Sequence, residues 1–150
     1  MTHLQFRRFA GCPICNLHLR SIVDRHAEIQ AAGIREVVVF HSPAEDLREY
    51  TLPFDIIADP TKKLYREFGV ETSRFALLHP KTIGAILAGS LRTLRRKDPA
   101  PKAHAGRLGL PADFLIAPTG QVLASKHGTH AYDQWTVDEL LTHARAFADR

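Results

Sequence analysis

The sequence predicts an α/β fold in which a central mixed β-sheet carries helices on both faces. Strand-like and helix-like segments alternate along the chain, which is typical of parallel strands joined by helical crossovers. The unbroken β-branched and aromatic run VVVF at residues 37–40 is typical of a central strand buried on both sides. Near the C-terminus, the turn PTG at residues 118–120 predicts a hairpin, which adds antiparallel strands.

Each element follows from a local signal. The first expected strand covers residues 4–9, and the helix after it has apolar side chains at helical spacing from Ile14 to Ile29 and stops at Gly33. The other expected elements, in order, are a strand at 37–40, a helix beginning near 43, a strand at 55–58, a helix at 62–68, a helical insert at 75–96, a loop at 98–109, strands at 112–117 and 121–125, and a closing helix at 137–147.

Two of these helices have full start signals. Ser42 is expected to cap the first, with Pro43 at the first helical position and Glu45 completing a capping box. Asp59 and Pro60 repeat the combination of cap and proline. We therefore expect each of these two helices to begin directly after a strand of the sheet.

Composition limits the function classes. The 150 residues, of which 45% are apolar, are expected to form a single domain, 1–150. The net charge is +4, and the basic run at 92–97 is more typical of a solvated helix face than of a nucleic-acid site. No stretch has the length of a membrane span or a signal peptide, and two cysteines are too few for a disulfide framework. We expect a cytoplasmic protein with reduced thiols and with neither nucleic acid nor membrane as partner.

Both cysteines lie in the stretch GCPIC at residues 11–15, and they are the candidate catalytic residues. Cys12 is expected at the N-cap of the helix, with Pro13 at the first helical position and Cys15 in the first turn. A helix N-terminus lowers the pKa of a thiol and so favours the nucleophilic thiolate. Cys12 is expected to be the exposed and more acidic thiol, and Cys15 the deeper one that resolves a mixed disulfide.

Other interpretations of the cysteine pair stay open. A CxxC can be half of a zinc site, and His127 and His130 lie elsewhere in the chain, but a second cysteine pair is missing. The cysteines can also be inert core residues. Arg7 and Arg8 precede the pair, and since side chains alternate along a strand, at most one of them faces the sulfurs.

Three segments resemble a known family. A strand followed by Gly-Cys-Pro-x-Cys at a helix start is similar to the thioredoxin-like superfamily, and FRRFAGCPICNLHLR resembles the opening motif of its peroxiredoxin-like branch (AhpC/TSA, redoxin). DPTKKLYREFGV and GLPADFLIAPTGQVL resemble later segments of that branch. The resemblance implies a thioredoxin-like fold and an antioxidant enzyme with a redox-active disulfide.

The resemblance also assigns residues. It implies that Pro111 matches the cis-proline that faces the cysteines in thioredoxins, and we expect Pro13 and Pro111 to contact the substrate. If Cys15 is aligned with the attacking cysteine of the peroxiredoxin signature, Cys12 stands at the position of its threonine and Arg8 at that of its proline, so the sequence departs from the signature. This alignment would reverse the roles and make Cys15 attack first. The downstream arginine of that signature has Arg92 and Arg107 as candidates.

Three further residues have less specific interpretations. His41 ends a predicted central strand, where a ligand can bind, but we expect a structural histidine with satisfied hydrogen bonds. Tyr132 and Trp135 precede the last helix and are expected to pack in the core or between two copies of a homodimer.

The sequence thus predicts a thiol-dependent oxidoreductase that uses a Cys12/Cys15 dithiol–disulfide couple and needs no further cofactor or metal. It would reduce peroxides or exchange disulfides, with electrons from a thioredoxin- or glutathione-type donor. The alternative is a non-catalytic binding or regulatory module that keeps the fold, with a metal at the CxxC.

Overall fold

The computed structural model describes residues 1–70, 72, 77–95 and 107–148. The strands are β1 (Thr2–Phe6), β2 (Arg35–Phe40), β3 (Asp55–Ala58), β4 (Ala112–Ile116) and β5 (Val122–His127). The helices are α1 (Pro13–Asp24), α2 (His26–Ala31), α3 (Ala44–Leu47), α4 (Lys63–Glu67), α5 (Pro80–Arg95) and α6 (Val137–Ala148). This order confirms the expected succession, except that the first long helix is divided at Arg25 into α1 and α2.

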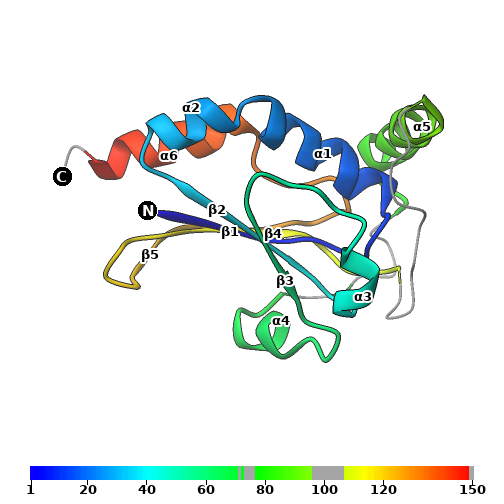
Figure 1. Cartoon of the computed structure of the whole chain (residues 1–150), viewed down its shortest axis with the longest axis horizontal. Coiled ribbons are helices and arrows are strands. Elements are labelled where there is room, and N and C mark those ends of the chain that lie inside the picture. Colours follow the sequence, from blue (N-terminus) through cyan, green and yellow to red (C-terminus); the bar gives the residue numbers. More distant parts are fainter. Residues whose placement is uncertain (71, 73–76, 96–106, 149–150) are drawn as a thin grey trace.

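The five strands form one mixed sheet in the order β3-β2-β1-β4-β5. β2 is parallel to both β1 and β3, whereas β4 is antiparallel to β1 and to β5. Helices α1, α2 and α6 lie on one face of the sheet and α4 lies on the other (Figure 1). The predicted mixed sheet with helices on both faces is therefore confirmed.

Apolar side chains fill both interfaces between the sheet and its helices. Under α1, α2 and α6 the core contains Ile22, Ile29, Leu115 and Leu140, each fully or almost fully buried. On the opposite face, Phe6, Val39, Tyr65, Ala112 and Phe114 pack together beneath α4. Tyr132 is partly buried against the core and Trp135 is 4% exposed, which agrees with a packing role for both.

Buried charges also lie on the face of α1 and α6. Arg7 donates to Asp113 at 2.7 Å, and His3 lies between Glu36 at 2.9 Å and Asp113 at 3.2 Å. Burial lowers the pKa of His3, but Glu36 and Asp113 outweigh it and raise that pKa to about 9. The network thus holds two cations and two anions, whose charges cancel.

The two predicted helix starts differ in outcome. Asp59 accepts hydrogen bonds from the backbone N–H groups of Lys63 and Leu64, so it satisfies the first turn of α4, although the helix begins later than expected, with Lys62 as its N-cap residue. Ser42 does not cap α3, because its hydroxyl accepts the N–H of Ala10 at 2.9 Å. Ser42 is therefore used to hold the segment that leads into the cysteine pair.

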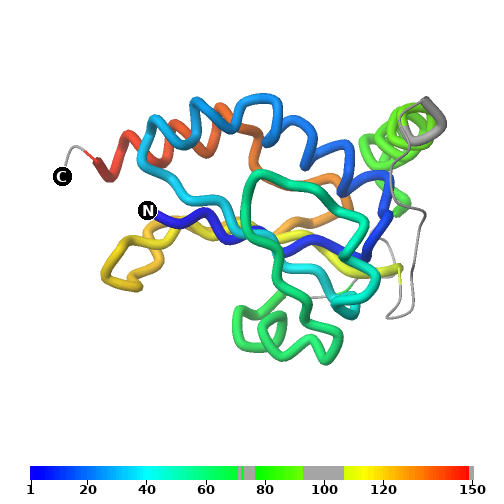
Figure 2. The backbone as a smooth tube through the Cα atoms, in the orientation of Figure 1, coloured from blue at the N-terminus to red at the C-terminus, as the bar shows by residue number. Residues whose placement is uncertain are grey.

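Helix α5 lies beside the N-terminal end of α1 (Figures 1 and 2). Gly89 permits this approach, because a Cβ at that position would lie 2.6 Å from the carbonyl oxygen of Pro13. The expected helical insert at 75–96 is thus largely confirmed. The expected loop at 98–109 lies mostly outside the described residues, as does part of the basic run at 92–97.

Candidate active site at the amino end of α1

The cysteine pair follows the carboxyl end of β1 and begins α1. Gly11 has φ +74°, which turns the chain from the strand into the helix. Cys12 is the N-cap residue in an extended conformation, its Sγ accepts the N–H of Cys15 at 3.4 Å, and Pro13 follows in the first turn. The predicted placement of Cys12, Pro13 and Cys15 is confirmed.

One side chain distant in sequence, that of Tyr50, holds the loop before Cys12. The N–H of Gly11 donates to the hydroxyl of Tyr50 at 2.7 Å, and this hydroxyl donates to Oδ1 of Asn16 at 2.8 Å. Tyr50 thereby ties the loop to the first turns of α1. The sequence analysis missed both residues, because no local pattern connects Tyr50 to a helix that begins at Pro13.

One arginine reaches the sulfur of Cys12. Nη1 of Arg8 donates to Cys12 Sγ at 3.5 Å, while the guanidinium of Arg7 bonds to Asp113. The expectation that only one of the two faces the sulfurs is therefore confirmed. The earlier candidates Arg92 and Arg107 are both exposed, whereas Arg8 is 2% exposed.

These contacts separate the acidities of the two thiols. Burial raises the pKa of Cys12, but the hydrogen bond from the Cys15 thiol, the charge of Arg8 and the backbone N–H groups at the helix start lower it to about 7. Burial also raises the pKa of Cys15, and the negative charge of Cys12 raises it further, well above its usual value. Cys12 is the more acidic thiol, as the sequence predicted.

The expected exposure of Cys12 is wrong. Cys12 is 0% exposed and Cys15 is 1% exposed. Both pack in one apolar cluster with Ala85 of α5, and the backbone of α5 at Gly89 lies against Pro13. The helical insert covers the sulfurs, and its position over α1 depends on contacts between segments that are distant in the sequence.

Pro111 also differs from the expectation. The peptide bond before it is trans, so the predicted cis-proline is wrong. Its carbonyl accepts the N–H of Gly128 at 2.8 Å, and a Cβ on Gly128 would lie 2.8 Å from Pro111 Cγ. Pro111 is thus fitted closely against Gly128 at the start of β4, and the structure gives it no bond to either cysteine.

His41 lies at the carboxyl end of β2, beside the segment that carries Arg8. Its backbone N–H donates to the carbonyl of Arg8 at 3.1 Å, and the side chain is 1% exposed. Within the described part of the chain, neither ring nitrogen of His41 has a hydrogen-bond partner. The expectation of a satisfied structural histidine is therefore wrong.

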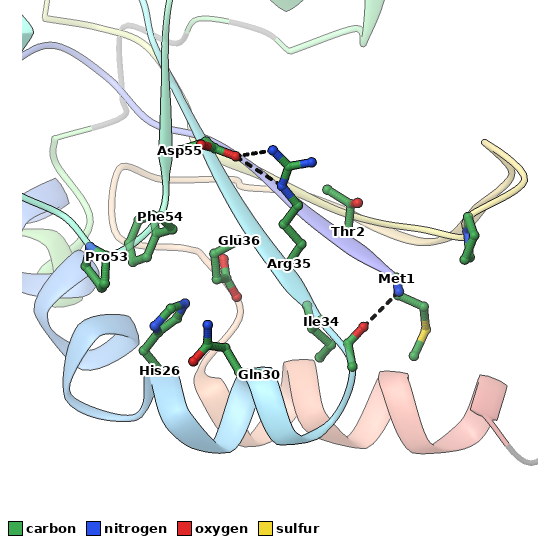
Figure 3. A pocket seen from close by; sticks show the side chains of 12 residues that line it. Met1, Thr2, His26, Gln30, Ile34, Arg35, Glu36, Pro53, Phe54 and Asp55 are labelled. Carbon is green, nitrogen blue, oxygen red and sulfur yellow. Dashed lines mark hydrogen bonds and ion pairs between the residues drawn. The ribbon is translucent and has the colours of Figure 1, made fainter.

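A metal site and a pocket away from the cysteines are two other kinds of candidate site. In the described ranges, no group of three or more His, Cys, Asp or Glu side chains is placed to hold a metal ion. A pocket of about 620 Å³ lies by Thr2, Arg35 and Asp55, where the parallel strands begin (Figure 3). Arg35 and Asp55 are paired with each other there. Cys12 follows the carboxyl end of β1, so this pocket and the cysteines lie at opposite ends of the parallel strands.

None of the described helices is long and apolar enough to cross a membrane.

Comparison with curated proteins gives no match. The family model of the AhpC/TSA antioxidant enzymes matches residues 21–130, which is more than half of the chain. The chain belongs to the AhpC/TSA antioxidant enzyme family. The matched segment begins after both cysteines, so the family assignment is independent of the CxxC stretch.

Solved structures confirm the thioredoxin-like fold of this AhpC/TSA chain. A mutant of peroxiredoxin 6 from Arenicola marina has a TM-score of 0.67 at 14% identity, over 98% of this chain but only 60% of that protein. The bacterioferritin comigratory protein of Xanthomonas campestris also has a TM-score of 0.67, at 16% identity over 98% of this chain and 79% of that one. A putative thiol:disulfide interchange protein DsbE from Chlorobium tepidum has 0.54, at 17% identity, over 98% and 77%.

Proposed function

We propose that this protein reduces small hydroperoxides, with Cys12 as the attacking thiolate and Cys15 as the resolving thiol. The observation that carries this proposal is the difference between the two sulfurs. Cys12 accepts the N–H of Cys15 and a hydrogen bond from Arg8, which favours its thiolate. Cys15 stays protonated one helical turn away.

The proposed reaction has two steps. The Cys12 thiolate attacks one oxygen of the hydroperoxide, so that an S–O bond forms, the O–O bond breaks, and the departing alkoxide takes a proton from water. Cys12 becomes a sulfenic acid and the peroxide is reduced by two electrons. The Cys15 thiol then displaces water from the sulfenic acid to form the Cys12–Cys15 disulfide. An external thiol donor, one dithiol of thioredoxin type or two molecules of glutathione type, returns the two electrons and is itself oxidised to a disulfide.

Burial supports a small substrate. Because Cys12 is 0% exposed beneath α5, a hydroperoxide can reach it with a smaller displacement of that helix than a protein disulfide requires. The neighbouring peroxiredoxin structures support the same substrate class for this fold. Pro13, the next residue in the chain, is proposed to border the substrate, whereas Pro111 packs against Gly128 and is not part of this proposal.

The test is stopped-flow oxidation of the reduced protein by hydrogen peroxide and by an organic hydroperoxide. We expect rate constants at least a hundredfold above that of a free thiol, and a product that has lost two hydrogens within one chain by non-reducing mass spectrometry. Cys15→Ser should still be oxidised and should accumulate the sulfenic acid, whereas Cys12→Ser should not react. Rates equal to those of a free thiol would refute the peroxidase proposal.

Thiol–disulfide exchange is the second candidate, and one observation favours it. The first cysteine of the CxxC is the acidic one, which is the arrangement that attacks protein disulfides in thioredoxin-like oxidoreductases, and a DsbE structure is among the neighbours. Reduction of insulin by the dithiol form, measured beside the peroxide reaction, separates the two. Fast exchange together with a slow peroxide reaction would replace the first candidate by the second.

A further inference from the structure

His41 is buried without the hydrogen bonds that a buried imidazole normally makes. It is 1% exposed, and both Nδ1 and Nε2 lack a partner among the described residues. A buried polar group without a partner costs about 1–3 kcal/mol, so native proteins keep few of them. The two nitrogens are therefore available to a ligand that is not part of the chain.

A third buried nitrogen with no partner lies next to them. Nε of Arg8 has no hydrogen bond within the described residues, although Nη1 of the same guanidinium binds Cys12 Sγ. His41 and Arg8 are neighbours, because both lie beside Gly109. A Cβ on Gly109 would be 3.4 Å from His41 Nε2 and 3.7 Å from Arg8 Cγ. One cluster therefore combines three unused nitrogens with the activated sulfur.

Gly109 has no side chain that would stand in front of the imidazole of His41. A Cβ there would lie 3.4 Å from Nε2 of His41, in van der Waals contact with the imidazole, and would occupy the position next to that nitrogen. Aromatic rings form other walls, since Tyr65 packs edge-on against the imidazole at 5.6 Å and Phe9 lies at 6.5 Å between ring centroids. Apart from Arg8, the imidazole is thus bordered by aromatic rings and by the backbone at Gly109.

The imidazole is neutral near pH 7. Burial and the charge of Lys62 lower the pKa of His41 to about 4, and Arg8 acts in the same direction, while an interaction with the residue's own backbone and the charge of Asp59 oppose them. A neutral imidazole carries one N–H donor and one acceptor nitrogen. Together with the N–H of Arg8, the cluster offers two donors and one acceptor.

We propose that His41 and the Nε of Arg8 form a subsite that binds the two oxygens of a hydroperoxide beside the Cys12 sulfur. A hydroperoxide has one O–H donor and two acceptor oxygens, which match the acceptor nitrogen and the two donors of the cluster. The inference rests on the proposed peroxidase function and adds to it the residues that recognise the substrate. The N–H of His41 then stabilises the negative charge that develops on the departing oxygen.

The experiment compares two reactions of the same sulfur in the Cys15→Ser background. Oxidation by hydrogen peroxide requires recognition of oxygens, whereas alkylation by iodoacetamide requires only an accessible thiolate. In His41→Phe we expect the peroxide rate constant to fall at least tenfold. The alkylation rate should change less than twofold, and its pH midpoint should stay the same. His41→Gln keeps a polar atom near Nε2 and should retain part of the peroxide rate.

Gly109→Ala tests the same space without removing the imidazole. It should also lower the peroxide rate and leave alkylation unchanged. His26→Phe, at the opposite edge of the sheet, is the matched control and should change neither reaction.

Two results would overturn the inference. Equal losses in both reactions would mean that His41 acts through packing alone, and an unchanged peroxide rate in His41→Phe and Gly109→Ala would mean that the subsite is not used. A parent protein that oxidises no faster than a free thiol would instead refute the peroxidase function itself, and the subsite with it.

Discussion

Replacing Arg8 by methionine removes a positive charge that contacts the Cys12 sulfur while keeping a buried side chain of similar length. Nη1 and Sγ are 3.5 Å apart, and both residues are buried, Arg8 being 2% exposed. At this distance, two unit charges attract by about 1 kcal/mol in water and by about 5 kcal/mol at an effective dielectric constant of ~20. Since ~1.36 kcal/mol equals one pKa unit, the pKa of Cys12 should rise by about one to three units.

The assay is the rate of iodoacetamide alkylation against pH in the Cys15→Ser background, in which only Cys12 can react. The parent midpoint is expected near 7, the value to which the structure lowers the pKa of Cys12. With Arg8→Met the midpoint should lie between about 8 and 10, and the rate at pH 7 should fall at least about fivefold because less thiolate is present.

Two control variants separate charge from packing. Arg8→Lys keeps a positive charge and should move the midpoint less than Arg8→Met. Arg92→Met removes an exposed arginine of α5 and should leave the midpoint unchanged. A midpoint that stays near 7 in Arg8→Met would show that the helix start alone activates Cys12, and the reasoning from Arg8 would be wrong.

Three other predictions concern the cover, the core and pH. Gly89→Ala places a methyl group 2.6 Å from the Pro13 carbonyl oxygen, so α5 must shift. Alkylation of Cys12 by a bulky reagent should then become several times faster, while the helical content measured by circular dichroism stays unchanged. Asp113→Asn leaves Arg7 without its buried anion and should lower the free energy of unfolding in urea by about 3–5 kcal/mol. Burial and a neighbouring imidazole lower the pKa of His130, so the melting temperature should fall as the pH drops below ~6.5, and it should fall less in His130→Gln.

Most of the fold could be predicted because its signals are local. The strand at 55–58 agrees with β3 residue for residue, and the capping role of Asp59 depends only on the residues that follow it. Ser42 had an equally good local signal, but its hydroxyl binds Ala10, which lies 32 positions away. A capping pattern therefore predicts that a helix begins nearby, but neither its first residue, since the N-caps are Pro43 and Lys62, nor the partner that a side chain selects.

The sequence predicted only those features of the site that depend on residues close to one another in the chain. Cys12 and Cys15 are both on one helical turn, so their relative acidity follows from the motif and the helix N-terminus. Tyr50, His41 and Gly109 reach the site from other segments. The alternation of side chains in the expected strand at 4–9 could exclude one arginine without showing that Arg8 is the one that remains. Burial of the sulfurs could not be predicted either, because it depends on where α5 packs.

The two arginines that follow β1 also have separate electrostatic tasks. Arg7 points to the face of α1 and α6, where Asp113 neutralises it, while the next residue, Arg8, turns to the Cys12 sulfur. The network around Arg7 carries no net charge, so disturbing it should cost stability without changing the acidity of Cys12. Asp113→Asn should therefore keep the alkylation midpoint of the parent under conditions where it is folded, whereas Arg8→Met should move the midpoint. A shift of similar size in both variants would mean that the buried network and the thiolate act as one coupled system.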